Sequence, residues 1–290
     1  MLGYFFKKIK FPDESFWKHL DKFNYFVLFP TLLFYKLSTA NVEGILNFDF
    51  VIIMGSILIA VSLLLVVINK MMKFNNDSFT SIYQGSIRFN TYVFLALTQA
   101  LLDEKSFIMG IVLITFLIPL INILCIAIFA SYVPKNKLSI ISILKSIVTN
   151  PLIVACFLGA SVNILGISFP ILIENTLQIL SVAALPLGLL SVGVGLHISS
   201  IGQAKLSVAL SSFVKLVFLP ILVYVVCIFF EVENDRIILL TLFASMPTAS
   251  SAYALARELG GDLKLISSIV SLQTILSIIT ISVIIWILNG

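Results

Sequence analysis

Apolar stretches long enough to cross a lipid bilayer recur along this chain, and they constrain its fold more than any other feature. An α-helix needs about 20 apolar residues to span the hydrocarbon core, because each residue adds about 1.5 Å. Hydrophobic residues make up 60% of the 290 residues and charged residues 11%, with a mean hydropathy of +1.13. This leaves too little polar surface for a soluble globule. The sequence therefore predicts an all-α, polytopic membrane protein.

The hydropathy pattern predicts nine spanning segments joined by short connections. They are expected at residues 24–40, 48–69, 79–100, 107–130, 143–165, 170–196, 206–230, 236–256 and 264–288. Residues 1–23 are too short and too weakly apolar for a signal peptide. The longest connection, which includes residues 131–142, is expected to be a short cytoplasmic linker, with no room for a soluble domain.

Basic residues lie almost entirely on one side of the predicted spans. That side carries Lys7, Lys8, Lys10, Lys18, Lys22, Lys70, Lys73, Lys135, Lys137, Lys145, Lys205, Arg257 and Lys264, whereas only Lys105 and Arg236 fall on the other. Cytoplasmic loops concentrate Lys and Arg. We therefore expect a multi-pass protein of the cytoplasmic membrane, with the N-terminal segment inside the cell and Gly290 outside.

The two halves of the chain align with each other as an internal repeat. When Pro30 is placed on Pro186, the same register pairs Asn90-Thr91 with Met246-Pro247, and it also pairs the starts of the neighbouring spans. An odd number of spans separates the partners, so the copies enter the membrane from opposite sides. We predict inverted five-helix repeats at residues 1–130 and 143–290. The first repeat would contain only four spans, because the partner of the segment at 143–165 is missing apart from MLGYFFKKI.

The most polar part of each repeat falls near the middle of a span. Pro247 interrupts an apolar segment at 236–256, in MPTASSAYALAREL, and Asn90 occupies the matching place in QGSIRFNTYVFLALTQA. Broken backbone at membrane depth is tolerated only where protein or a water-filled cavity surrounds it. If both helices break and cross there, their N-terminal ends direct partial positive charge at one point. The expected ligand is an anion such as a carboxylate.

Six residues are candidates for binding this anion, and one further residue is a candidate counter-charge. The six are Arg88, Asn90, Thr91, Pro247, Thr248 and Ser250. Arg88 offers a planar fork to a carboxylate, whereas the polar side chains offer hydrogen bonds; the alternative is that all of them bond helices together. Lys215 lies well inside a span, where it is expected to be a counter-charge, a surrogate for a coupling cation, or a snorkelling residue.

Other chemistry has little support in the sequence. Cys125, Cys156 and Cys227 lie in apolar runs without metal-ligand spacing, so neither a metal nor a cofactor is expected. The spans contain no histidine, and the motifs of common hydrolases are absent. We expect neither an enzyme nor a nucleic-acid-binding protein.

Several segments resemble the auxin efflux carrier family of secondary transporters, especially its bacterial malate or malonate permease-like members. They are FVLFPTLLF, RFNTYVFLAL, TNPLIVACFLGASVNILGISFP, ALPLGLLSVGVGL and MPTASSAYALARELGGD. The resemblance implies inverted repeats with broken helices that cross around Asn90 and Pro247, and a homodimer. Many members have a proline after the Asn-Thr pair, but this chain continues YVFLALT, so that break would rest on polar residues alone.

The expected function is alternating-access transport of a small organic anion, such as malate, malonate or an auxin-like carboxylate, coupled to protons or the membrane potential. A sodium-coupled carrier of a larger amphipathic anion is the nearest alternative within transport. A membrane sensor that binds a metabolite without moving it is an alternative from another class. The sequence does not distinguish these possibilities, nor does it identify the substrate or the direction of transport.

Overall fold

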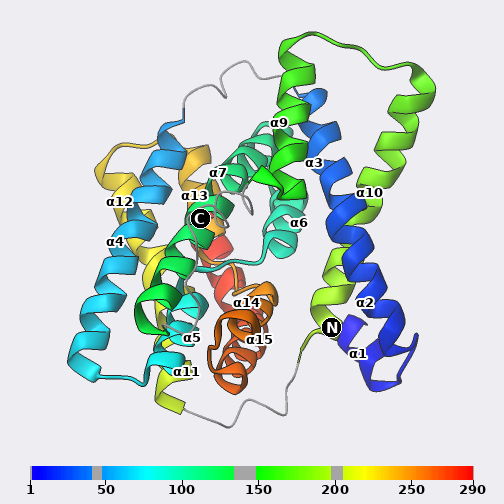
Figure 1. Ribbon diagram of the computed structural model, residues 1–290. Helices are drawn as coiled ribbons and strands as arrows, with labels where there is room; N and C mark the ends of the chain where they lie inside the picture. Colours follow the sequence, from blue (N-terminus) through cyan, green and yellow to red (C-terminus); the bar gives the residue numbers. More distant parts are fainter. Residues whose placement is uncertain (1, 41–47, 134–147, 197–204, 290) are drawn as a thin grey trace. The chain divides into compact units, whose positions relative to one another are not determined.

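The computed structural model describes residues 2–40, 48–133, 148–196 and 205–289, and all its regular elements in these ranges are helical (Figure 1). Five helices or joined helices are long and apolar enough to cross a bilayer: Asp49–Met72, Glu104–Tyr132, Ile171–Val194, Leu206–Phe229 and Leu263–Leu288. The prediction of an all-α polytopic membrane protein is therefore confirmed. The other predicted spans appear as broken helices, as a helix interrupted by a π turn, or as the shorter apolar helix Pro151–Ile164.

The chain forms two compact units, each assembled from three separate segments. The first comprises Met1–Asn47, Leu95–Thr115 and Ser139–Leu196, and the second comprises Phe48–Phe94, Phe116–Leu138 and His197–Gly290. Each unit thus takes segments from both predicted repeats. The repeats at 1–130 and 143–290 describe a relationship between sequences and remain a prediction. Most of the predicted linker at 131–142 lies outside the described residues.

The first unit is built on close contacts between helices. It contains α1 (Leu2–Lys8), α2 (Glu14–Phe23), η1 (Asn24–Leu28), α3 (Phe29–Ser38), α9 (Pro151–Ile164) and α10 (Ile171–Val194). Helix α3 packs against α9 and α10, and α1 packs against α10. Glycines permit this approach: a Cβ at Gly3 would lie 2.0 Å from the carbonyl oxygen of Leu190, and one at Gly159 would lie 2.7 Å from that of Phe34.

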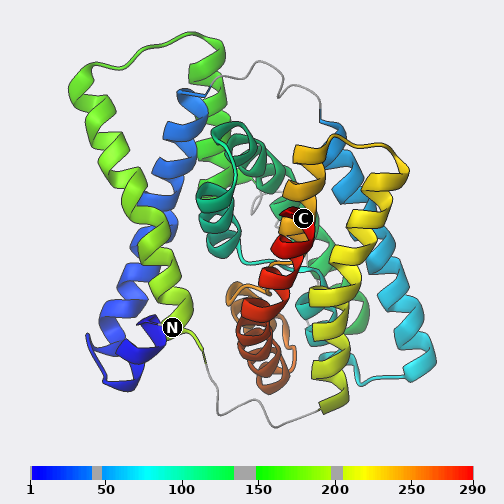
Figure 2. The same ribbon diagram turned by 180° about the vertical axis from the view of Figure 1, so that it is seen from behind.

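The second unit contains both helix breaks. Its helices are α4 (Asp49–Met72), α5 (Asn76–Ile87), α11 (Lys205–Phe213), η3 (Val214–Phe218), α12 (Leu219–Phe229), α13 (Asn234–Ala244), α14 (Ser251–Leu259) and α15 (Leu263–Asn289). Helix α5 packs against α4, α11, α14 and α15, whereas α12 packs against α4 and α13. The full length of α15 is visible from behind in Figure 2. Helices α6 (Thr91–Leu101) and α7 (Glu104–Tyr132) contribute residues to both units.

Two helices contain the same irregularity immediately before a proline. The π turn η1 precedes Pro30, and η3 precedes Pro220. A proline within a helix lacks an N–H group, and its ring displaces the carbonyl one turn earlier. The backbone adapts with a wider turn, in which the N–H of Phe29 bonds to the carbonyl of Asn24 and that of Leu219 bonds to the carbonyl of Val214. The helix continues beyond each proline.

Candidate functional site

The first helix break lies between α5 and α6. Helix α5 ends at Ile87, Arg88 is extended with φ −71° and ψ 156°, and α6 begins at Thr91. The side-chain oxygen of Asn90 accepts hydrogen bonds from the backbone N–H groups of Tyr92 (3.1 Å) and Val93 (3.2 Å). Asn90 is therefore an N-cap, and it satisfies donors that the start of α6 would otherwise leave without partners. Polar residues break this span without a proline.

The second break lies between α13 and α14. Helix α13 ends at Ala244, and α14 begins at Ser251. Pro247 and Thr248 lie between them and are buried, whereas Ser250 is exposed. Pro247 falls within this non-helical segment, where its missing N–H group removes no helical hydrogen bond.

The two breaks meet in the second unit, and backbone groups join them directly. The N–H of Asn90 donates to the carbonyl of Pro247 at 2.8 Å. The hydroxyl of Thr248 donates to the carbonyl of Gly85 at 2.7 Å and lies 3.3 Å from that of Arg88. The end of α5 therefore obtains from the opposite break the partners that helix continuation would have supplied.

Gln273 of α15 joins this crossing from a third helix, and sequence reasoning missed it. Its side-chain nitrogen donates to the carbonyl of Gly85 (2.9 Å), and its oxygen accepts from the N–H of Thr248 (3.0 Å). Its nitrogen also lies 3.4 Å from the hydroxyl oxygen of Ser211. Gln273 is completely buried. The available signal was a lone amide within the apolar stretch LISSIVSLQTILSI, because buried amides in a membrane require partners.

The six predicted binding residues lie at the two helix breaks, three at each. Arg88, Asn90 and Thr91 lie at one break, and Pro247, Thr248 and Ser250 lie at the other. These residues differ in which polar groups remain available to a ligand. The Thr248 hydroxyl already bonds to backbone, whereas Asn90 uses only its side-chain oxygen to cap α6. These assignments remain predictions of binding.

Lys215 and Arg88 are basic side chains of this unit that lie well inside predicted spans. Lys215, in η3, is completely buried, and its Nζ has no hydrogen-bond partner among the described residues. The turn that carries it packs against both α5 and α15. Arg88 is partly buried, with one terminal nitrogen 3.5 Å from the hydroxyl oxygen of Ser251, and its guanidinium group also lies beside the buried thiol of Cys125. A buried charge without a partner is costly, so this region favours an anion.

A separate cavity in the first unit has a different character. It has a volume of about 630 Å³ and is lined by residues that include Gln99, Gln178 and Pro186. Lys36 also lines it, and the Lys36 ammonium pairs with the Glu104 carboxylate at 3.1 Å. This cation is already neutralised. The crossing of the second unit is therefore the better candidate for binding an anion.

The helices and the polar crossing together define a polytopic membrane protein with two interrupted helices. The model of a family described as membrane transport protein matches residues 134–285. Because this match covers more than half of the chain, the protein belongs to that family, which comprises the auxin efflux carriers. It is a membrane transporter by family. A comparison with curated proteins gives no match.

Proposed function

We propose that the protein is a secondary active transporter of small organic anions in the cytoplasmic membrane, working by alternating access. The observation that carries this proposal is the crossing of two broken helices beside buried basic side chains. The N-terminal ends of α6 and α14 begin at the breaks, and each supplies partial positive charge.

Arg88 and Asn90 would contact the substrate most directly. The guanidinium group of Arg88 lies beside the Ser251 hydroxyl and the Cys125 thiol, which are weaker acceptors than a carboxylate, and it could form a bidentate bond to a carboxylate. The side-chain amide of Asn90 can donate while its oxygen continues to cap α6. A small mono- or dicarboxylate such as malate, malonate or indole acetate fits this arrangement of donors.

Lys215, on a turn that packs against α5 and α15, would act as a counter-charge to the anion rather than as a direct ligand. The described acidic side chains of this unit lie at helix ends and in loops, as Asp49, Asp77, Glu233 and Asp262 do. A positive charge at Lys215 would lower the cost of bringing a carboxylate into a low-dielectric region. Proton or sodium coupling and the expected homodimer remain predictions.

The test is uptake and counterflow of labelled malate, malonate and indole acetate in proteoliposomes, with imposed proton or sodium gradients as separate arms. We expect saturable flux that Arg88→Gln and Asn90→Asp abolish. Thr274→Val is the matched control, because among the described residues the Thr274 hydroxyl bonds only within α15, to the carbonyl of Val270. Ligand-induced thermal stabilisation without flux would instead support a sensor. Neither binding nor flux with any of these anions would reject the proposed substrate class.

A further inference from the structure

The cavity of the first unit that contains the Lys36–Glu104 ion pair has the size usual for small-molecule sites, at about 630 Å³. Residues of α3, α6, α7 and α10 or of their ends line it, and all of them belong to the first unit. Leucine, valine, alanine and proline side chains form part of the wall, and charged and amide side chains form another part. Such a wall suits a ligand that has both an apolar body and a polar group.

The Lys36 ammonium is held at this cavity by more than its ion pair. Lys36 lies in the last turn of α3, where the helix carbonyls favour a cation. Its Nζ also lies 5.7 Å from the ring centre of Phe107, a buried residue of α7. A cation beside an aromatic ring is stabilised by the electrons of the ring. The ammonium would therefore keep favourable contacts if Glu104 moved away.

Glu104 is held much less firmly than its partner. Its side chain is 79% exposed, whereas that of Lys36 is 24% exposed. An ion pair with such an exposed member contributes little to stability. Glu104 is also the first residue of α7, where the helix dipole favours a carboxylate whether or not Lys36 is near. A carboxylate from a ligand can therefore replace Glu104 on Lys36 at small cost.

Apolar side chains continue from Lys36 along two packed helices. Leu32 lies one turn before Lys36 on α3, and Leu185 and Leu189 lie one turn apart on α10, which packs against α3. All three leucines line the cavity. A ligand whose carboxylate binds Lys36 would therefore find an apolar surface for the rest of its body in the same cavity.

We propose that this cavity is a peripheral binding site for a carboxylate with an apolar body, which binds by replacing Glu104 on Lys36. The peripheral site shares no residue with the crossing of the second unit. It extends the proposed function, on which its role in transport rests, because it gives the anion a second place to bind. Glu104 acts as an internal competitor there, and the leucines favour indole acetate over malonate.

Equilibrium binding of labelled indole acetate to the detergent-purified protein tests this proposal. Asn90→Asp serves as the background, because it is expected to disable binding at the crossing and leave the peripheral site. In this background, Lys36→Gln should weaken binding about tenfold, since a bond between charged groups is lost. Glu104→Gln should strengthen binding by up to about fivefold, because the competing carboxylate is gone. Misfolding cannot explain a gain in affinity.

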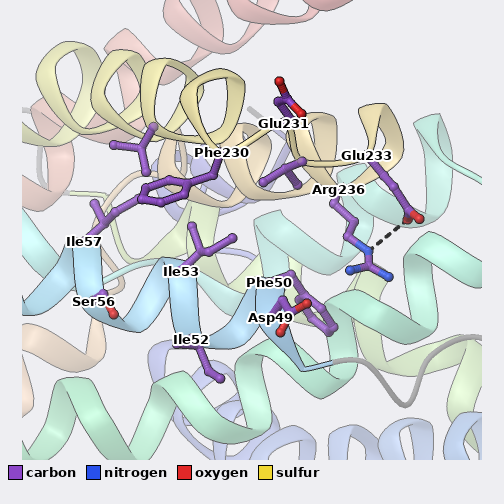
Figure 3. Close-up of a pocket in the computed structure, with 12 residues that line it drawn as sticks. Asp49, Phe50, Ile52, Ile53, Ser56, Ile57, Phe230, Glu231, Glu233 and Arg236 are labelled. Atoms are coloured by element: carbon purple, nitrogen blue, oxygen red, sulfur yellow. Dashed lines mark ion pairs between the residues drawn. The ribbon is translucent and has the colours of Figure 1, made fainter.

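A comparable ion pair in the second unit supplies the matched control. Arg236 and Glu233 also pair at 3.1 Å, and both line a cavity of that unit (Figure 3). Glu233→Gln removes the same charge as Glu104→Gln and should leave the affinity for indole acetate unchanged. Indole acetamide, which is uncharged, and malonate, which lacks an apolar body, should both bind weakly.

The outcomes separate this site from the proposed transport function. Absence of indole acetate binding to Asn90→Asp would overturn the peripheral site, whether or not the wild-type protein transports anions. Unchanged affinity in Lys36→Gln or in Glu104→Gln would also overturn it. Binding that follows both substitutions, together with no flux in proteoliposomes, would uphold the peripheral site and reject transport.

Discussion

The backbone N–H of Asn90 donates to the carbonyl of Pro247 across 2.8 Å, and it joins the two breaks that the internal repeat aligns. Each break supplies what the other lacks: Pro247 provides an acceptor to Asn90, and Thr248 provides a donor to Gly85. Each unpaired backbone group at membrane depth would cost roughly several kcal/mol of folding free energy. The two interruptions are therefore structurally interdependent, and neither is expected to persist unchanged if the other is removed.

Substitution of Asn90 separates its capping role from the proposed anion binding. Asn90→Ala should lower the free energy of unfolding by about 1 kcal/mol, the usual effect of removing an N-cap. Asn90→Asp should retain the cap, and hence most of the stability, while placing a negative charge where the anion is proposed to bind. Thermal unfolding and proteoliposome flux measure the two effects. Unimpaired anion flux in Asn90→Asp would contradict the proposed site.

Replacement of Gln273 should destabilise the crossing. Gln273→Leu leaves the Thr248 N–H without its acceptor and removes one of the donors to Gly85, at a cost of about 1 to 3 kcal/mol for each buried group left unsatisfied. Chemical denaturation in detergent measures the loss. Gln178→Leu is a suitable control, because Gln178 is an exposed amide on α10. Equal stability of the two variants would show that the Gln273 bonds contribute little.

Gly85 should not tolerate even one added methyl group. A Cβ there would lie 2.5 Å from the Ser211 hydroxyl oxygen and 2.6 Å from Cγ2 of Ile269, on two neighbouring helices. Gly85→Ala should therefore destabilise the protein by about 1 to 3 kcal/mol, as overpacking does. In the control Gly55→Ala, the new Cβ would meet its nearest atom at 3.5 Å, an ordinary contact. Thermal melting of both proteins should reveal loss only at Gly85.

Replacing Lys215 with an apolar residue should raise the stability of the protein and lower its transport activity. Lys215→Met replaces a buried ammonium lacking a partner among the described residues with an apolar chain of similar length, so the melting temperature should rise. Anion flux should fall, because the proposed internal positive charge is lost. Both quantities can be measured on one preparation in detergent and proteoliposomes. Unchanged flux together with greater stability would assign Lys215 no part in transport.

Asp103 should contribute a small pH dependence to stability. Hydrogen bonds from the Ser106 side chain and backbone N–H lower the pKa of this carboxyl below its usual value. The stabilisation is therefore present above the unfolded-state pKa and is lost as the pH falls through the lower folded-state value, below about 4. Asp103→Asn should flatten this part of the stability profile. Melting temperatures measured from neutral pH to pH 3 compare the wild-type protein with Asp103→Asn. If the two proteins lose stability identically at acidic pH, Asp103 makes no such contribution.

The sequence predicted the helical, membrane-spanning organisation because hydropathy is encoded locally. Pro247 marked one break directly, and its alignment with Asn90 marked the other, although YVFLALT supplies no proline there. Asn90 breaks the helix by capping α6, a role that only the backbone geometry reveals. Gln273 could not be placed from sequence, because its partners Gly85 and Thr248 belong to distant segments. Each compact unit combines segments from both predicted repeats, and this arrangement likewise depends on tertiary packing.

The π turns before Pro30 and Pro220 have a consequence for how chain length can vary. A π turn contains one residue more than the α-helical turn that it replaces. Deleting one residue between Asn24 and Leu28, or between Val214 and Phe218, would convert the wide turn into an ordinary α-helical turn and leave the side chains before and after it facing as they do now. These two turns are therefore sites where the chain can lose a single residue in evolution without changing the helix face that packs.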